Sequence, residues 1–458
     1  MRKAFVRIVK NREQMLSHGC RKGRRIALEI IEHAIKAVDP YRKVMKLVRV
    51  ESSRKLIVDK LTYDLSKIGD IYVVGAGKAT FSIAKALEDI LGQRLMKGVV
   101  IVKRGHGGKL GRTEVLEASH PIPDGASVKA SRKIVNIAKQ AKERDLVFCA
   151  ITGGASALMS LPPGKITLED KKKVTKLLLK SGATLYEINT VRKHISAIKG
   201  GKLAKYIHPA EIVNLIVIDE VEGLPWGPTV PDTTTFQDAA RVLRKYNLWR
   251  AIPGSVKDYL SDGLRNPSLE TPKPKDFTGL KVHNVVLADI RSVCQAAREK
   301  ARSLGLNSMI LSTRLEGESK EVGTVLGCIA KEIEERREIL KPPCVLILGG
   351  ETTVKLSKHW GKGGPSQEFA LGSALKIGGS EKIIVASVDT DGTDGPTDIA
   401  GGIVDGYTLK RAGEKGLDIF TSLSEHNSSR VLRALDDAIM TGPTGTNVAD
   451  LNIVVITA

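Results

Sequence analysis

Short apolar runs that alternate with amphipathic stretches are the feature that most restricts the fold of this chain. In the first half, strands are predicted at 71–74, 98–103, 145–152 and 212–218, and helices at 24–38, 79–92, 126–143 and 168–181. Strands that are apolar on both faces need helices on both sides of a parallel sheet. The sequence therefore predicts an α/β protein.

The same alternation restarts after residues 266–279, which contain three prolines and are predicted to be a linker. Later strands are predicted at 283–290, 308–313, 344–350, 382–389 and 452–457, with helices at 292–305 and 318–340. A chain of 458 residues is long for one domain and comfortable for two. We therefore expect two α/β units.

Composition excludes several classes of protein. Aromatic residues are only 4% and no nucleic-acid-binding motif is present, so we expect no nucleic-acid partner. The net charge of +21 favours small anionic ligands, although a basic surface that only keeps the protein in solution is the simpler explanation. The five cysteines never form a C-x-x-C pair, which indicates reduced thiols and no zinc site. No stretch has the length of a membrane span, and we expect a cytoplasmic protein.

Glycine-rich turns follow two of the predicted strands, and α/β sheets bind ligands at the carboxyl ends of their strands. The first turn, "GAGKAT", contains Gly75, Gly77 and Lys78. It lacks the third glycine of the dinucleotide motif, so a tight structural turn is about as good an interpretation. A lysine at a helix N-terminus opposes the helix dipole, and an anionic ligand would relieve that cost.

The second turn, "TGGASA", places Gly153, Gly154 and Ser156 at a helix start, where backbone amides can bind phosphate or carboxylate. A strand-to-helix turn with a serine cap is the structural alternative. The surroundings are not those of a hydrolase nucleophile.

Basic residues crowd the stretch "EINTVRKHISAIKGGKLA". Asn189, Arg192 and Lys199 are its candidates for binding an acidic substrate, although for this stretch alone a solvated basic face is the better explanation. His194 is interpreted as structural. Asp219 ends the strand that follows and could act as a general base or hold Mg²⁺, with helix capping as the ordinary alternative.

The second half carries polar and acidic strand ends. The candidates for the nucleotide are Glu351, Thr352, Thr353 and Gln367, and the candidates for the metal are Asp389, Asp391 and Asp394. The aspartates do not fit the EF-hand spacing, whereas Mg²⁺ needs only one or two carboxylates. Aspartate–glycine turns explain some of them without any metal. Glycine turns, cations and strand-end acids together predict a site for phosphoryl transfer.

Six stretches in order resemble the glycerate 2-kinase family, the MOFRL proteins that were formerly often labelled hydroxypyruvate reductases. They are "VVGAGKA", "VRKHISAIKGGKLA", "GPTVPD", "GGETTV", "TDGTDGPTD" and "TGPTGTNV". The resemblance implies an ATP- and Mg²⁺-dependent kinase that phosphorylates D-glycerate at its 2-hydroxyl. It also implies two α/β/α (Rossmann-like) domains with an interdomain cleft and the second domain inserted in the first. We accordingly expect 1–260 plus 425–458 as one domain and 280–424 as the other.

The resemblance also assigns roles to residues. Lys78 falls on a lysine thought to be important for catalysis, and Asp219 becomes a candidate base or metal ligand. Arg192 and Lys199 would line the site, and Arg291 is what remains of a family Asn-Arg element. The partners so implied are a hydroxy acid and a nucleotide, and we allow for a homodimer.

Four stretches depart from the family pattern. Pro365 and Ser366 replace a usual Arg-Asn pair, and Ala155 replaces a glycine. The stretch "IDEVEG" and the shortened loop "LPW" after it differ from the family pattern, and so does "ADIRSV". These changes leave three alternatives open: a kinase for another hydroxy acid, a nucleotide binder without catalysis, and, with less support, a hydroxypyruvate reductase.

Overall fold

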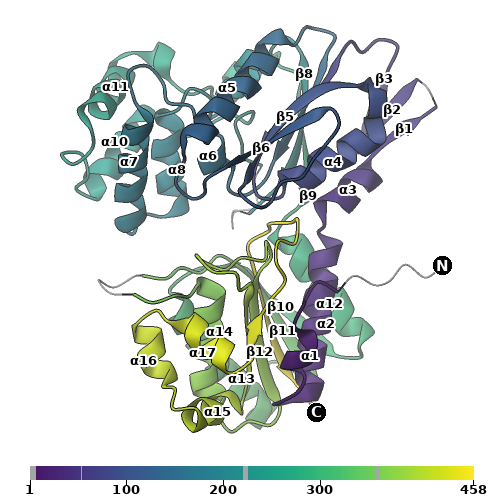
Figure 1. Ribbon diagram of the computed structural model, residues 1–458, viewed down its shortest axis with the longest axis vertical. Coiled ribbons are helices and arrows are strands. Elements are labelled where there is room, and N and C mark those ends of the chain that lie inside the picture. The colour runs from purple at the N-terminus through teal and green to yellow at the C-terminus, as the bar shows by residue number, and fades with distance from the viewer. Residues whose placement is uncertain (1–6, 53, 220–224, 356–359) are drawn as a thin grey trace. The chain divides into compact units, whose positions relative to one another are not determined.

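The computed structural model describes residues 7–52, 54–219, 225–355 and 360–458 and confirms an α/β protein (Figure 1). It divides into two compact units. The terminal unit comprises Met1–Asp39, Asp219–Gly223 and Ala288–Ala458, and the inserted unit comprises Pro40–Ile218 and Leu224–Leu287. Each unit contains one six-stranded sheet.

The sheet of the inserted unit has the order β6-β5-β4-β7-β8-β9, and its pairing is parallel from β6 through β8. Its strands are β4 (Ile71–Ala76), β5 (Leu95–Lys103), β6 (Thr113–Ala118), β7 (Leu146–Ile151), β8 (Glu211–Val217) and β9 (Val282–Ala288). β4 and β7 are buried along their whole length, as the apolar runs predict.

Helices pack on this sheet and also form a second apolar core beside it. The first group is α4 (Thr80–Leu91), α5 (Gly125–Gln140), α6 (Ala155–Leu158) and α9 (Lys202–Ile207). The second core, around Phe236, joins α7 (Leu168–Lys180), α8 (Leu185–His194), α10 (Phe236–Lys245) and α11 (Gly254–Arg265). A small antiparallel sheet precedes β4 and follows α3 (Pro40–Leu47): β1 (Val48–Glu51), β2 (Lys55–Val58) and β3 (Leu61–Asp64).

The sheet of the terminal unit is mixed, with the order β10-β11-β15-β12-β13-β14. Its strands are β10 (Asn307–Leu315), β11 (Cys344–Gly350), β12 (Ile383–Asp389), β13 (Gly401–Asp405), β14 (Ala438–Ile439) and β15 (Asp450–Ile456). Its helices are α1 (Arg12–Met15), α2 (Arg21–Ala37), α12 (Ile290–Ser303), α13 (Ser319–Arg336), α14 (Pro365–Ile377), α15 (Thr408–Glu414), α16 (Ile419–Ser424) and α17 (Ser428–Ala434).

The last strand belongs to the sheet of the terminal unit, so the expected grouping of residues 425–458 with residues 1–260 is wrong. β15 lies between β11 and β12 and pairs antiparallel with both. The central position explains why β15 is buried along its whole length and reads as an apolar run. Residues 425–458 therefore belong to the terminal unit, to which residues 1–39 also belong.

Residues 266–279, which were predicted to be a linker, do not connect the two units. These residues belong to the inserted unit, because the backbone amide of Asp232 donates to the carbonyl of Pro272 and Glu270 pairs with His194 at 3.0 Å. Their prolines open two short 3₁₀ turns, Pro267–Leu269 and Pro274–Phe277. The unit boundary falls at 287/288, and residues 1–39 join the terminal unit instead of the first sheet.

Two helices of the terminal unit, α13 and α14, approach each other closely through glycines. A Cβ on Gly323 would lie 2.1 Å from the carbonyl oxygen of Phe369, and one on Gly372 would lie 2.3 Å from that of Lys320. Only glycine allows such a separation. This packing fixes the N-terminus of α14, which lies beside the acidic strand ends described below.

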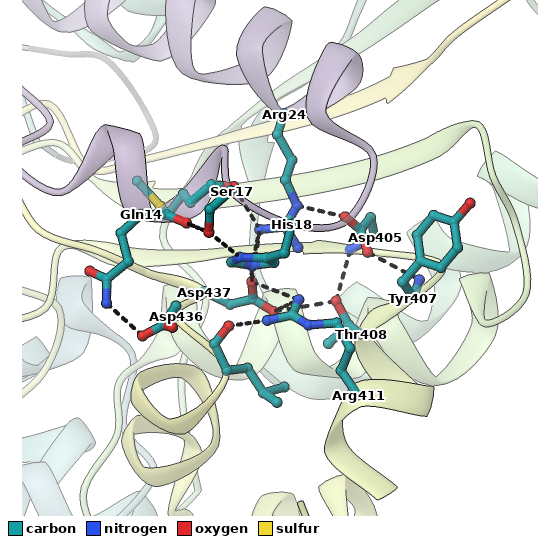
Figure 2. A network of polar contacts seen from close by, with 12 residues as sticks. Gln14, Ser17, His18, Arg24, Asp405, Tyr407, Thr408, Arg411, Asp436 and Asp437 are labelled. Atoms are coloured by element: carbon teal, nitrogen blue, oxygen red, sulfur yellow. Dashed lines mark hydrogen bonds and ion pairs between the residues drawn. The ribbon is translucent and has the colours of Figure 1, made fainter. Parts of the chain in front are cut away.

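A buried ion-pair network fastens α2 to the terminal unit (Figure 2). The fully buried Arg24 donates from Nε to Asp405 at 2.6 Å and from Nη1 to Asp437 at 2.7 Å. Asp437 also accepts from Arg411, and His18 Nε2 lies 2.9 Å from its Oδ1. Because the carboxylates and cations compensate each other here, the network is structural.

Within the described residues, no helix is long and apolar enough to cross a membrane. The five cysteines are all free thiols.

We expect Arg24→Ala to lower the free energy of unfolding by about 3–5 kcal/mol, because it leaves two buried carboxylates without their main cation. Urea unfolding measures this change. Arg25→Ala, at an exposed neighbour on the same helix, is the control and should change stability by less than about 0.5 kcal/mol. Equal effects of the two variants would contradict the structural role of Arg24.

Candidate functional site

The turn between β4 and α4 uses its backbone amides inside the protein. The amide of Gly77 donates to the carbonyl of Ile101 at 3.0 Å, and that of Lys78 donates to the carbonyl of Gly153 at 2.8 Å. The amide of Ala79 donates to Thr152 Oγ1 at 3.1 Å. These three amides are therefore not presented to a dinucleotide, and the turn instead fixes the backbone of Lys78.

The glycines of this turn allow β4 to approach β7. A Cβ on Gly75 would lie 2.2 Å from the carbonyl oxygen of Ala150. Gly77 has a φ of +143°, and a Cβ there would lie 2.0 Å from Thr152 Oγ1. Both glycines are thus explained by packing, and their predicted role in cofactor binding stays a prediction.

The Gly153–Gly154 turn follows β7 and lies next to the side chains of Lys78 and His120. Gly154 has a φ of +86°, and a Cβ there would lie 3.2 Å from both Lys78 Cγ and His120 Cδ2. In the part of the chain that the structure describes, the amides of Gly153 and Gly154 have no hydrogen-bond acceptor. The turn therefore offers two amides beside a lysine and a histidine, which suits an anion. His120 was not predicted from the sequence.

Four other predicted residues lie next to this turn. Lys199 Nζ donates to the carbonyl of Ser156 at 2.5 Å, and Ser156 Oγ donates to Asn189 Oδ1 at 3.4 Å. Asn189 and Arg192 lie one helical turn apart on α8. The structure thus brings together Lys78, Gly153, Gly154, Ser156, Asn189, Arg192 and Lys199.

The basic cluster, which we define as Lys171, Arg192 and Lys199, carries positive charge away from water. Lys171 is 4% exposed and Lys199 8% exposed, and Lys171 Nζ donates to the carbonyl of Ile195 at 2.9 Å. Burial, and then Arg192 and Lys202, lower the pKa of Lys171 to about 7.

The other two cations of the cluster are shifted in the same direction. Burial, and then Lys171 and Arg192, lower the pKa of Lys199 well below its usual value, and burial lowers that of Arg192 to about 10. Among the described residues, none of the three forms an ion pair with a carboxylate. A buried cation without a counter-charge is costly, so this cluster is suited to a bound anion.

Neighbouring basic residues have carboxylate partners and are structural. Lys193 Nζ lies 2.5 Å from Asp232 Oδ1, and Glu270 and Asp232 partly offset the burial that lowers the pKa of Lys202 to about 8. His194 contacts the carbonyl of Thr190 and the carboxylate of Glu270, both acceptors, as expected of a structural histidine.

Lys171 was missed from the sequence, although a signal existed. It lies on the buried face of α7 together with Val174, Thr175 and Leu178. A lysine in phase with the apolar face of a helix is an unusual pattern, because lysine is almost never fully buried unless it is paired.

Three strand ends bring acids together in the terminal unit. Asp450, at the start of β15, pairs in register with Asp389 of β12 on one side and with Gly350 of β11, directly before Glu351, on the other. Asp450 is 7% exposed, and burial, followed by Asp389, Asp394 and Glu351, raises its pKa well above the usual value. The sequence signal for this missed residue is an acid opening a buried strand.

Several predicted ligands of the terminal unit bind protein groups instead. Asp394 accepts from the amides of Ser366 and Gln367 at 3.1 and 2.9 Å and so caps α14, while burial raises its pKa to about 7. The Gln367 side chain donates to Asp394 and accepts from Ser429. Asp391 accepts from the amide and hydroxyl of Thr393, as in an Asx turn.

The threonines after β11 also have structural contacts. Thr352 Oγ1 accepts from Ser319 Oγ at 3.0 Å, and the amide of Thr353 donates to the carbonyl of Gly317 at 2.9 Å. No group of three or more His, Cys, Asp or Glu side chains is arranged to hold a metal ion in the described residues. The metal roles predicted for Asp389, Asp391 and Asp394 stay a prediction.

The remaining predicted residues are spread over the terminal unit. Asp219 Oδ2 accepts from Asn447 Nδ2 at 3.4 Å. Arg291 is exposed at the start of α12, in a different unit from Arg192 and Lys199. Pro365 opens α14, where a first-turn proline is favourable. The departure "IDEVEG" with "LPW" falls mostly on residues 220–224, which lie outside the described residues.

The burial of Lys171 predicts a pH effect on stability. Between pH of about 7 and about 10 the unfolded chain binds the proton that folded Lys171 has lost, so the free energy of unfolding rises with pH. Lys171→Met removes this cost, so the variant should be about 1–4 kcal/mol more stable than wild type at pH 7. Between pH 7 and pH 9 its free energy of unfolding should rise less than that of wild type. Urea unfolding at both pH values measures this. The exposed Lys176→Met is the control, and a Lys171→Met variant less stable than wild type at pH 7 would contradict an uncompensated charge.

Known proteins resemble the chain over nearly its whole length. The family described as "Domain of unknown function (DUF4147)" matches residues 26–261, and the MOFRL family matches residues 344–450. A glycerate 2-kinase from Pyrococcus horikoshii is 48% identical and aligns with 95% of this chain and 98% of its own length. A D-glycerate 2-kinase from Thermotoga maritima is 38% identical over 94% of this chain and 97% of its own.

A solved structure agrees with the fold. The crystal structure of a glycerate kinase from Thermotoga maritima matches with a TM-score of 0.78 and 38% identity, over 94% of this chain and 99% of that one. The two family matches lie in order along one chain, and the relatives are similar over almost their full length. The chain therefore belongs to the glycerate 2-kinase family, with its DUF4147 and MOFRL domains.

Proposed function

We propose that this protein is an ATP- and Mg²⁺-dependent kinase that phosphorylates D-glycerate at the 2-hydroxyl. The observation that supports this most is the basic cluster beside Lys78 and the Gly153–Gly154 turn, in which buried cations lack a protein counter-charge. An anionic substrate supplies that charge. The full-length relatives named as glycerate 2-kinases support the choice of substrate.

The inserted unit would bind the acceptor. Arg192 and Lys199 pair with the glycerate carboxylate, and Asn189 orients one of its hydroxyls. Lys78, held by the turn that packs on Gly153, neutralises charge that develops on the transferring phosphoryl group. Removing one such cation slows phosphoryl transfer because the transition state carries charge on its non-bridging oxygens.

The terminal unit would bind the nucleotide and its metal. The residues fit Mg²⁺ in one respect: the buried Asp450 pairs in register with the half-buried Asp389, and burial, followed by repulsion from Asp389, raises the pKa of the Asp450 carboxyl. A divalent cation would remove that repulsion. Mg²⁺ would supply charge neutralisation at the nucleotide phosphates. Glu351 and the turn after β11 lie at the same strand ends, and Asp219 is the proposed base for the accepting hydroxyl.

A hydroxypyruvate reductase is the second candidate, and the geometry favours it less. A nicotinamide cofactor would need the amides of the turn after β4 for its pyrophosphate. Three of those amides already donate to Ile101, Gly153 and Thr152. The kinase proposal uses the Lys78 side chain instead and needs none of these amides.

The direct test is ³¹P NMR of the protein with Mg-ATP and D-glycerate. Phosphate on the 2-oxygen couples to one proton and gives a doublet, whereas phosphate on the 3-oxygen couples to two and gives a triplet. We expect the doublet, and about a 100- to 1,000-fold lower rate for Lys78→Met.

Lys85→Met is the matched control for that variant, because Lys85 lies on α4, the helix that begins directly after the Lys78 turn, in an exposed pair with Asp89. Its rate should equal that of wild type. A triplet, unreacted ATP, or oxidation of a reduced nicotinamide by hydroxypyruvate would each contradict the proposed function.

The metal assignment has its own test. Asp450→Asn should raise stability without Mg²⁺, because it removes a buried carboxyl beside Asp389, and should raise the Mg²⁺ concentration needed for half of the maximal rate. Melting curves and initial rates over a Mg²⁺ series measure both effects. Asp398→Asn, at an exposed acid of the loop that follows Asp389, is the control. An unchanged Mg²⁺ requirement in Asp450→Asn would remove Asp450 from the metal site.

A further inference from the structure

When its three side chains are protonated, the basic cluster carries more positive charge than the proposed substrate can compensate. Lys171, Arg192 and Lys199 come from α7, from α8 and from the segment that follows α8, and they influence one another electrostatically. D-glycerate brings one negative charge. A phosphorylated glycerate brings its carboxylate and a phosphate of about −1.5 to −2.

The side chains of the cluster leave hydrogen-bonding capacity for a ligand with several oxygens. Within the described residues, the Arg192 guanidinium has no hydrogen-bond or ion-pair partner, although burial lowers its pKa to about 10. Lys199 donates to one carbonyl, that of Ser156, and an ammonium has three N–H donors. A guanidinium and an ammonium with free donors match a tetrahedral phosphate as well as a carboxylate.

The structural alternative explains only one member of the cluster. Lys171 donates to the carbonyl of Ile195, the residue that ends α8, and a cation at a helix C-terminus is favourable. Lys199 donates to the carbonyl of Ser156 in the single turn of α6 and not to α8, and the half-buried Arg192 has no hydrogen-bond acceptor within the described residues. Capping of α8 therefore leaves Arg192 and Lys199 to be compensated by a ligand.

We propose that the basic cluster makes this site selective for anions of two or more negative charges, so that the product 2-phosphoglycerate binds more tightly than glycerate. The identity of the two ligands rests on the proposed function, whereas the preference for charge rests on the cluster alone. It follows that the product competes with glycerate for this site. The depressed pKa values of Lys171 and Lys199 add a second consequence, because a multiply charged ligand restores their protons as it binds.

Isothermal titration without ATP tests the proposal. We expect 2-phosphoglycerate to bind at least about tenfold more tightly than D-glycerate, and to take up protons, measured as a dependence of the binding heat on the ionisation heat of the buffer. Inorganic phosphate and acetate give the same comparison without any assumption about the reaction, and phosphate should bind more tightly.

Lys171→Met should weaken 2-phosphoglycerate about tenfold, weaken glycerate less, and remove much of the proton uptake. Melting curves test whether this variant is folded. We expect it to be folded, because the substitution should raise its stability. Lys176→Met, an exposed lysine of the same helix, is the matched control and should bind both ligands like wild type.

The outcomes separate this proposal from the proposed function. Equal affinities for phosphate and acetate, or an equal loss of glycerate and 2-phosphoglycerate binding in Lys171→Met, overturn the charge preference even if the kinase is active. Tighter binding of phosphate by a protein that does not phosphorylate glycerate supports the charge preference and overturns the function.

Discussion

Buried and half-buried ionisable groups of like charge are the constraint on which the functional interpretation depends. In the inserted unit they are Lys171, Arg192 and Lys199, and in the terminal unit burial and the neighbouring Asp389, Asp394 and Glu351 raise the pKa of Asp450. In its charged form each group raises the free energy of the folded chain, and a ligand of opposite charge stabilises it. A phosphoryl-transfer enzyme needs both kinds of ligand, an anionic substrate and a metal-bound nucleotide.

The same chain also contains charged side chains that have a partner of opposite charge, and these differ from the basic cluster in that respect. Arg24 is more deeply buried than the cations of the basic cluster, yet two aspartates accept from it (Figure 2). Lys193 has Asp232, and His194 has Glu270. These pairs hold helices in place and need no ligand. Burial of a charge therefore points to a site in this protein only where the counter-charge is missing.

Much of the fold could be predicted from the sequence, because β4, β7 and β15 are buried along their length and appear as apolar runs. Strand order could not, since the partners of β15 lie about 60–110 residues away and an apolar run does not specify its neighbours. The candidate site was predicted in part. Ser156, Asn189 and Lys199 do lie together, whereas Asp394 and Gln367 bind each other. Lys171 and Asp450 were missed because only the structure shows which charged side chains lack a counter-charge.

A crystal structure of the protein with 2-phosphoglycerate bound would test the central claim most directly. The account predicts that oxygens of the ligand lie within hydrogen-bonding distance of Arg192 and Lys199, next to the Gly153–Gly154 turn, with the basic cluster thereby compensated. A ligand bound elsewhere, with these cations still lacking a counter-charge, would contradict it.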